Sequence, residues 1–133
     1  MPELYSAAVL LNPVSKKNSQ QILINRKTGR PFISPSKAYK TFEKACLSQL
    51  PKPEKPISSP VNVMCVYYMA TKRKVDLCNL IEATCDILVR AGVLEDDNSG
   101  IVVSHDGSAV RYDKQYARTE VTITEAENDR ATD

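Results

Sequence analysis

The chain has 133 residues, 42% of them hydrophobic and 26% charged, which is typical of one globular domain. Its longest apolar run, residues 63–70, is far shorter than the roughly 20 residues of a membrane-spanning helix, and Glu3 stands where a signal peptide would carry a basic residue. The 4 cysteines show no CxxC or histidine grouping, which argues against a disulfide framework and against zinc. We expect one domain over residues 1–125 and a polar tail over residues 126–133, in a reducing cytoplasm without a membrane partner.

Charge is divided unevenly along the chain. Residues 1–75 carry 13 Lys or Arg and 3 Asp or Glu, a net charge of +10, whereas residues 76–133 carry 5 and 13, a net charge of −8. Such a division suits a protein with one surface that attracts a polyanion and another that gathers carboxylates, as in a metal-dependent nuclease. A basic front half and an acidic tail that are both merely solvated would give the same numbers.

The first elements are predicted to be a strand and a hairpin. Residues 4–11 are apolar and end at Asn12-Pro13, because proline lacks a backbone donor. Apolar runs at residues 22–24 and 31–33 flank a short basic turn in which Gly29 can adopt a positive φ. The turn carries three cations at its tip: Arg26, Lys27 and Arg30.

A helix, a linker and a strand follow. Apolar residues recur at helical spacing from Tyr39 to Leu50 after a helix start offered by Ser34-Pro35-Ser36, and Lys37, Lys40 and Lys44 form a basic stripe on the other face. Residues 51–60 contain four prolines and read as a surface linker. Residues 61–71 form the strongest predicted strand.

The C-terminal half predicts a second helix over residues 76–91, ended by Gly92 as a left-handed cap. An acidic turn at residues 95–98 and two strands, at residues 101–104 and 117–124, come after it. The order βββαβαββ has too few crossovers for a doubly wound sheet. We therefore predict an α+β fold, a two-layer sandwich of one mixed β-sheet with two main helices.

Three carboxylates are candidates for a metal site: Asp76 at the start of the second helix, and Asp96 and Asp97 beyond its end. Extended residues after the helix could bring Asp97 back toward Asp76 in one chain, or toward Asp76 of a second copy. Beside the basic run 72–74, such carboxylates would suit Mg²⁺ and phosphodiester hydrolysis. A helix cap at Asp76 and a solvated acidic turn are the simpler interpretation.

The stretch KRKVDLCNLIEATCDILVRAGVLEDDNSG resembles the signature of the RusA family of Holliday-junction resolvases, endodeoxyribonucleases of bacteria and their phages. That signature is a basic run, Asp-x-Asp-Asn, a helix and an acidic pair. The segments NPVSKKNSQQ and RPFISPSKAYKTFEKAC are similar to the family's opening loop and first helix. The resemblance extends from about residue 5 to residue 124, and implies a bacterial or prophage origin.

The resemblance implies a homodimer that cuts four-way DNA junctions with Mg²⁺, for which Mn²⁺ could substitute. It assigns the catalytic and metal-binding role to Asp76 and Asp97, with Asp96 beside them and Asn79 completing the motif. The cations expected to hold DNA phosphates are Lys16, Lys17, Lys72, Arg73 and Lys74.

Two residues depart from the family pattern. Cys78 stands where the second Asp is expected, and a thiol is a poor ligand for Mg²⁺. Glu82 stands where a lysine is common, and it lies too far round and along the helix from Asp76 to share one ion. The alternative function is therefore a junction-binding protein with weak or lost cleavage. A structural or interaction protein unrelated to DNA is a third reading, which would make the motif and the charge division coincidental.

Other candidates are weaker. We expect His105 to lie in a loop or at a strand edge, without a catalytic partner. Cys78 and Cys85 lie seven residues apart and so on nearly one helix face, which favours core packing over a redox pair. Of Tyr67 and Tyr68, one is expected in the core, because alternate residues of a strand point to opposite faces.

Overall fold

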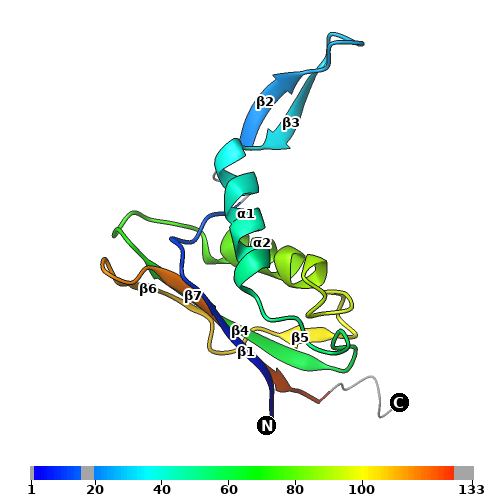
Figure 1. The fold of residues 1–133 in the computed structure, drawn as a ribbon, viewed down its shortest axis with the longest axis vertical. Helices are drawn as coiled ribbons and strands as arrows, with labels where there is room; N and C mark the ends of the chain where they lie inside the picture. Colours follow the sequence, from blue (N-terminus) through cyan, green and yellow to red (C-terminus); the bar gives the residue numbers. More distant parts are fainter. Residues whose placement is uncertain (1, 16–19, 128–133) are drawn as a thin grey trace.

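The structure is a computed structural model and describes residues 2–15 and 20–127 (Figure 1). Two helices and seven strands follow one another along this part of the chain. They are β1 (Glu3–Val9), β2 (Gln20–Ile24), β3 (Pro31–Pro35), α1 (Lys37–Gln49), β4 (Val61–Met69), α2 (Leu77–Arg90), β5 (Val102–Ser104), β6 (Ala109–Tyr112) and β7 (Arg118–Glu125).

The main sheet has five strands and is mixed. Strand β7 lies between β1 and β4 and is antiparallel to both. Strands β5 and β6 pair in parallel with successive parts of the other edge of β4. Because β1 and β4 both run opposite to β7, they run parallel to each other and to β6.

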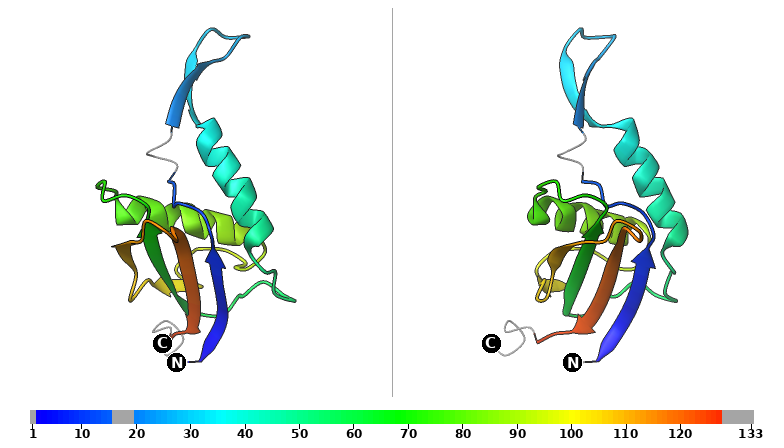
Figure 2. Two further views of the ribbon diagram at one scale, coloured as in Figure 1. Left: turned by 60° about the vertical axis from the view of Figure 1, so that its left-hand side comes forward. Right: turned by 90° about the vertical axis from the view of Figure 1, so that its left-hand side faces the viewer.

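Both helices cover one face of this sheet, so the predicted α+β two-layer architecture is confirmed (Figure 2). Alternate residues of β4, from Val61 to Met69, are buried against the helices, as the two-residue repeat of a strand requires. Helix α2 buries Leu80, Ile87 and Leu88 against them. Burial of this apolar surface stabilises the fold.

Local signals at the helix ends are confirmed. Ser36 caps α1 by accepting a hydrogen bond from the Tyr39 N–H at 3.1 Å. Gly92 follows α2 with φ of 75°, the left-handed conformation that suits glycine. The three lysines predicted as a basic stripe on α1 are all exposed: Lys37, Lys40 and Lys44.

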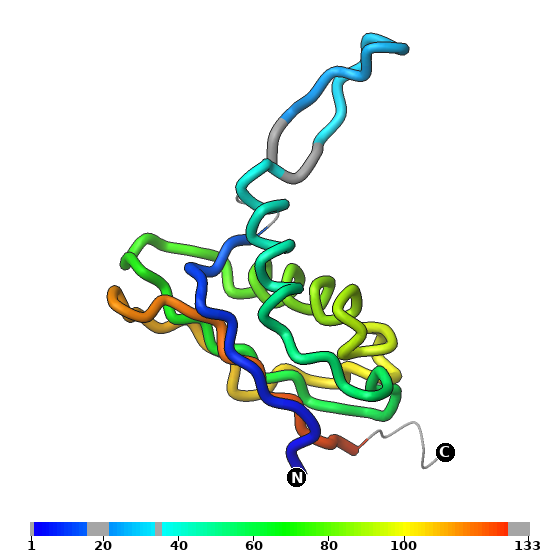
Figure 3. The backbone as a smooth tube through the Cα atoms, viewed as in Figure 1, coloured from blue at the N-terminus to red at the C-terminus, as the bar shows by residue number. Residues whose placement is uncertain are grey.

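The β2–β3 hairpin forms a separate two-stranded sheet. It projects from the body beyond the N-terminal end of α1, as the tube in Figure 3 shows. Gly29 in its turn has φ of 68°, as expected. The predicted hairpin is therefore confirmed, and it lies outside the main sheet.

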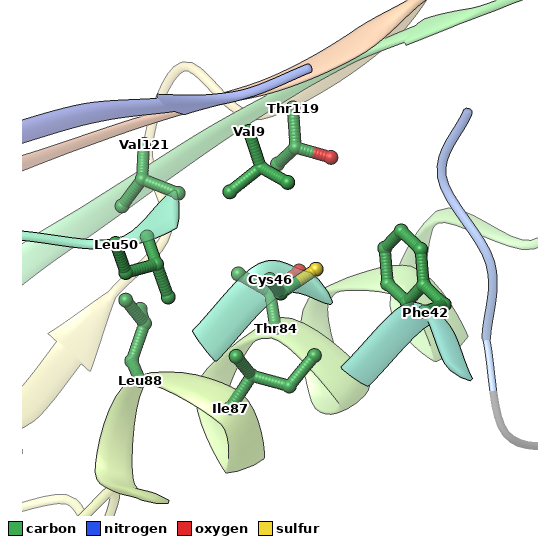
Figure 4. A pocket seen from close by; sticks show the side chains of 9 residues that line it. All are labelled: Val9, Phe42, Cys46, Leu50, Thr84, Ile87, Leu88, Thr119 and Val121. Atoms are coloured by element: carbon green, nitrogen blue, oxygen red, sulfur yellow. The ribbon is translucent and has the colours of Figure 1, made fainter. Parts of the chain in front are cut away.

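A small apolar cavity of about 20 Å³ lies between the two helices and the sheet (Figure 4). Phe42 and Cys46 of α1 line it together with Ile87 of α2 and Val9 of β1. Its size is close to that of one water molecule and its walls are apolar, so it is a packing defect rather than a binding site.

Two features differ from the sequence predictions. Strand β6 was not predicted, because its four residues mix apolar and charged side chains and pair only with the distant β4. The linker 51–60 is pinned to the body, because Ile57 forms a β-bridge with Leu94.

Lys16, Lys17 and residues 128–133 of the predicted tail lie outside the described residues. In the part of the chain that is described, no helix is long and apolar enough to cross a membrane.

Candidate functional site

Three loops meet at one end of the main sheet. Strands β1, β4 and β6 are parallel, so the loops that follow them all leave the sheet at the same end. Asn12, in the loop after β1, accepts a hydrogen bond from the Ala70 N–H at 2.9 Å through its side-chain oxygen. Asp113, just after β6, donates its N–H to the carbonyl oxygen of Met69 at 2.9 Å. These two bonds hold both neighbouring loops against the loop after β4.

A cavity of about 790 Å³ opens between the first two of these loops and the start of α2. One wall comes from residues 12–15 and the other from Met69, Thr71 and residues 73–76, including Arg73, Lys74 and Asp76. The sequence placed residues 12–15 in a loop but did not place them in the wall of a cavity. The strand end at Asn12-Pro13 was visible, but its position beside residue 70 depends on the pairing of strands far apart in sequence.

Asp76 caps α2 and also lines this cavity. Its Oδ1 accepts hydrogen bonds from the backbone N–H groups of Cys78 at 2.9 Å and Asn79 at 3.3 Å. A carboxylate at this position satisfies orphan donors of the first turn and interacts favourably with the helix dipole. The structural interpretation of Asp76 as a cap is thus correct, and the same side chain also lies beside Arg73 and Lys74 in the cavity wall.

The acidic turn has a defined conformation. It begins beside Ile57, whose carbonyl oxygen accepts a hydrogen bond from the Glu95 N–H at 2.9 Å. Asp96 accepts bonds from the Asp97 N–H at 2.8 Å and from the Asn98 side-chain amide at 2.9 Å. The Asp97 N–H and the Asn98 amide lower the pKa of the Asp96 carboxyl, which therefore stays ionised.

Asp97 lies close enough to α2 to influence a buried thiol. The pKa of Cys85 is raised to about 12, first by burial and further by the neighbouring charges, among them Asp97. Cys85 is nine residues beyond Asp76, or about 13 Å along the helix axis at 1.5 Å per residue. The acidic turn is anchored near the start of β4, through Ile57 and the pairing of Val61 with Val102, whereas Asp76 and the cavity lie at the other end of that strand, beside Met69.

The donor chemistry of these carboxylates fits a hard divalent cation. Among residues 2–15 and 20–127, no group of three or more His, Cys, Asp or Glu side chains could hold a metal ion. Mg²⁺ commonly takes only one or two carboxylates and completes its coordination with water and substrate phosphates. Asp76 and the pair Asp96 and Asp97 offer oxygen ligands of that kind.

The structure separates the two cysteines of α2. Cys85 is buried, whereas Cys78 is exposed at the first turn, so the prediction of core packing is correct for Cys85 and wrong for Cys78. The two are on nearly one face, but Cys78 lies in the first turn of α2, ahead of Leu80, the first buried residue of the helix. Glu82 is exposed and Asn79 is half-buried.

Aromatic residues stand beside the basic loop that follows β4. The ammonium of Lys72 lies 5.2 Å from the centre of the Tyr112 ring. Tyr112 and Tyr116 are 47% and 68% exposed, and both belong to the third loop or the strand before it. They were not singled out in the sequence, because only the parallel pairing of β4 with β6 brings them to Lys72. Exposed aromatic rings among cations can stack on unpaired bases.

Two further predictions are settled by contacts away from the cavity. His105 donates from Nδ1 to the Val63 carbonyl oxygen at 2.8 Å. Val63 lies in β4 between the residues that pair with β5 and those that pair with β6. The predicted position of His105 at a strand edge is therefore confirmed. Tyr67 is buried and bonded to Thr84 at 2.6 Å. Tyr68 points to the opposite face and stacks under Arg118, 3.8 Å from its ring centre.

Comparisons with known proteins add one match. Comparison with curated proteins gives no match to this chain. A family model described as "Endodeoxyribonuclease RusA" matches residues 11–124, which include all three loops, both helices and the acidic turn. Because the match covers most of the chain, the protein belongs to the RusA family of endodeoxyribonucleases, which implies an enzyme that resolves Holliday junctions in DNA.

Proposed function

We propose that this protein is a divalent-metal-dependent endonuclease that cuts four-way DNA junctions at the cavity beside Asp76. The observation that carries the proposal is the position of this carboxylate, in the lining of a cavity of about 790 Å³ that Arg73 and Lys74 also line. Anionic and cationic groups side by side suit a metal ion and a phosphodiester respectively.

The protein's own residues would divide the work. Asp76 and Asp97, with Asp96 beside them, would hold Mg²⁺ or Mn²⁺, and the bound ion would offset negative charge on the reacting phosphate. Lys72, Arg73 and Lys74 would hold backbone phosphates, and so would Lys16 and Lys17. Asp76 is fixed by the two N–H groups that it caps, which would keep its other oxygen oriented without further reorganisation.

A homodimer is part of the proposal. A four-way junction has approximate two-fold symmetry, so a two-fold dimer would present one site to each of two strands, and paired cuts would follow from the symmetry. Asp97 of the second copy would then complete the site, because the acidic turn and Asp76 of one chain lie at opposite ends of β4.

The direct test is cleavage of labelled four-way junction and linear duplex by the wild type and by Asp76→Asn and Asp97→Asn variants, with Mg²⁺, Mn²⁺ or chelator. We expect metal-dependent cutting of the junction by the wild type, and loss of cutting with retained junction binding in both variants. Asp106→Asn is the matched control, because Asp106 is exposed in the loop between β5 and β6. Cutting by either site variant at the wild-type rate would remove that residue from the site.

A substitution of Cys78 would distinguish an efficient nuclease from a protein that binds junctions and cuts them feebly. The exposed thiol lies two residues beyond Asp76, and its N–H bonds to that carboxylate. Cys78→Asp would supply a hard oxygen ligand there. We expect faster Mg²⁺-dependent cutting with little change in melting temperature, with Cys78→Ser as the control. An unchanged rate in the folded variant would show that residue 78 does not limit catalysis.

A further inference from the structure

The projecting hairpin has apolar side chains exposed on both of its faces. Ile22 pairs with Ile33 and Leu23 with Phe32, so one face presents isoleucines and the other presents Leu23 and Phe32. Ile22 is 74% exposed and Phe32 is 46% exposed. An isolated two-stranded hairpin is only marginally stable in water, so contact of these side chains with another molecule would stabilise it.

The charge of the hairpin indicates the kind of molecule. Residues 20–42 contain five Lys or Arg and no Asp or Glu. Arg26, Lys27 and Arg30 lie at the exposed tip, and no carboxylate in the hairpin can neutralise them. A concentration of unbalanced cations favours a polyanion.

The tip is an organised turn. The Asn25 side-chain oxygen accepts hydrogen bonds from the N–H groups of Lys27 at 2.9 Å and Thr28 at 3.3 Å. The Asn25 N–H bonds to the Arg30 carbonyl oxygen at 2.9 Å, and the Gly29 N–H bonds to the Asn25 carbonyl oxygen at 2.7 Å. The three cations are therefore held together at the far end of the arm.

We infer that the β2–β3 hairpin is a DNA-binding arm that enters the branch point of a four-way junction. Its tip cations contact backbone phosphates, and Phe32 with its neighbouring isoleucines packs against base pairs that have lost a stacking partner at the branch. Proteins insert apolar wedges of this kind between base steps elsewhere. This inference rests on the proposed function, and it extends the contact with DNA to a surface far from Asp76.

The dimensions of the arm suit this role. Five residues per strand correspond to about 17 Å at the rise of an antiparallel strand. Inserted end-on, a two-stranded ribbon of this length would extend past the depth of the major groove, which is about 8.5 Å. The alternative is that the apolar faces of the hairpin contact a second copy of this chain, in which case the cationic tip would face protein.

The test uses two sets of hairpin variants of the full chain. One is the triple variant Arg26→Gln, Lys27→Gln and Arg30→Gln, with single Arg30→Gln compared against Lys55→Gln, an exposed cation of the 51–60 segment. The other is the double variant Phe32→Ser and Ile33→Ser, compared against Leu4→Ser, an exposed apolar change on β1. Binding is measured with four-way junction and linear duplex over a range of salt concentrations, and sedimentation gives the oligomeric state.

We expect the triple variant to bind the junction about tenfold or more weakly. The slope of log affinity against log salt should fall by about 0.9 for each phosphate that the arm no longer neutralises. The double variant is expected to lose junction binding more than duplex binding. It should also fail to increase the fluorescence of 2-aminopurine placed at the branch point, which the wild type should increase. Lys55→Gln and Leu4→Ser should behave as wild type.

Two results would overturn the inference. If both hairpin variants kept the junction affinity of the wild type, the arm would not bind DNA. If their oligomeric state also changed, a second copy of the chain would be the partner of the arm. Equal losses on junction and duplex would exclude the branch point. Failure of the wild type to bind junctions at all would instead contradict the proposed function, so the two failures are distinguishable.

Discussion

The main sheet and the β2–β3 hairpin use similar residues in opposite surroundings. In β4, each second side chain is buried under the helices, and the core residue Val63 has no exposed surface. In the hairpin, Ile22 and Ile33 are 74% and 67% exposed although they stand directly opposite each other. Apolar strands in the sheet therefore stabilise the fold, whereas those of the hairpin are free to serve binding.

The largest expected effect comes from a substitution in the core, compared with one in the hairpin. Leu88→Ala removes a side chain of α2 that is 0% exposed, and we expect a loss of about 2–5 kcal/mol in the free energy of unfolding. Ile22→Ala in the hairpin should change it by less than about 0.5 kcal/mol. Urea unfolding followed by circular dichroism measures both. Similar losses would mean that the hairpin is packed against something in the free protein.

A smaller effect separates folding from charge at the start of α2. Asp76→Ala removes a helix cap and should cost about 1 kcal/mol, whereas Asp76→Asn keeps a capping oxygen and should cost close to nothing. Thermal unfolding of the two variants provides the comparison. If Asn were as destabilising as Ala, the carboxylate charge rather than its hydrogen bonds would stabilise the helix.

Thiol reactivity sharpens the contrast between buried and exposed positions. Burial raises the pKa of Cys46 and Cys85 to about 12 and that of Cys65 to about 11, so these thiols remain protonated at pH 8 and are also shielded. We expect iodoacetamide to label Cys78 alone in the folded protein and all four cysteines in urea, as read by mass spectrometry. Labelling should disappear in Cys78→Ser, and rapid labelling of a second site would show that the core opens.

The smallest expected effect depends on pH. The Tyr116 N–H and the Arg118 guanidinium lower the pKa of Asp113, and the Arg118 guanidinium lies 3.0 Å from that carboxylate. A carboxyl with a lowered folded pKa stabilises the protein above its unfolded pKa, and this contribution is lost as pH falls through the folded value. Asp113→Asn should therefore be less stable than wild type above about pH 4, with a difference that fades in more acidic solution. A constant difference down to pH 2 would attribute it to geometry instead of charge.

Local features of the fold could be predicted because they depend on neighbouring residues. Examples are the helix start within residues 34–36, the positive φ at Gly29 and Gly92, and the two helices with their periodic apolar faces. Sheet order could not be predicted in this way. Tyr5 pairs with Ile123, and no local pattern specifies partners so far apart in the chain.

The same division holds at the candidate site. Asp76, Arg73 and Lys74 lie close together in sequence, and their grouping could be predicted. The opposite wall at residues 12–15 and the aromatic neighbour Tyr112 could not, because both depend on the parallel arrangement of β1, β4 and β6. Exposure of Cys78 also needed the structure, since helical spacing alone placed it with buried Cys85.

The proposed double use of Asp76, as a helix cap and as a metal ligand, would have an evolutionary consequence. Folding requires only a capping side chain at position 76, and Asn or Ser would serve, whereas residue 78 contributes only its backbone N–H to the cap. Selection for stability alone would therefore tolerate drift at both positions and would leave the scaffold intact. A lineage that needed only to hold DNA could lose the chemistry without losing the protein, and an acidic side chain kept at position 76 over long divergence would be a record of selection for cutting.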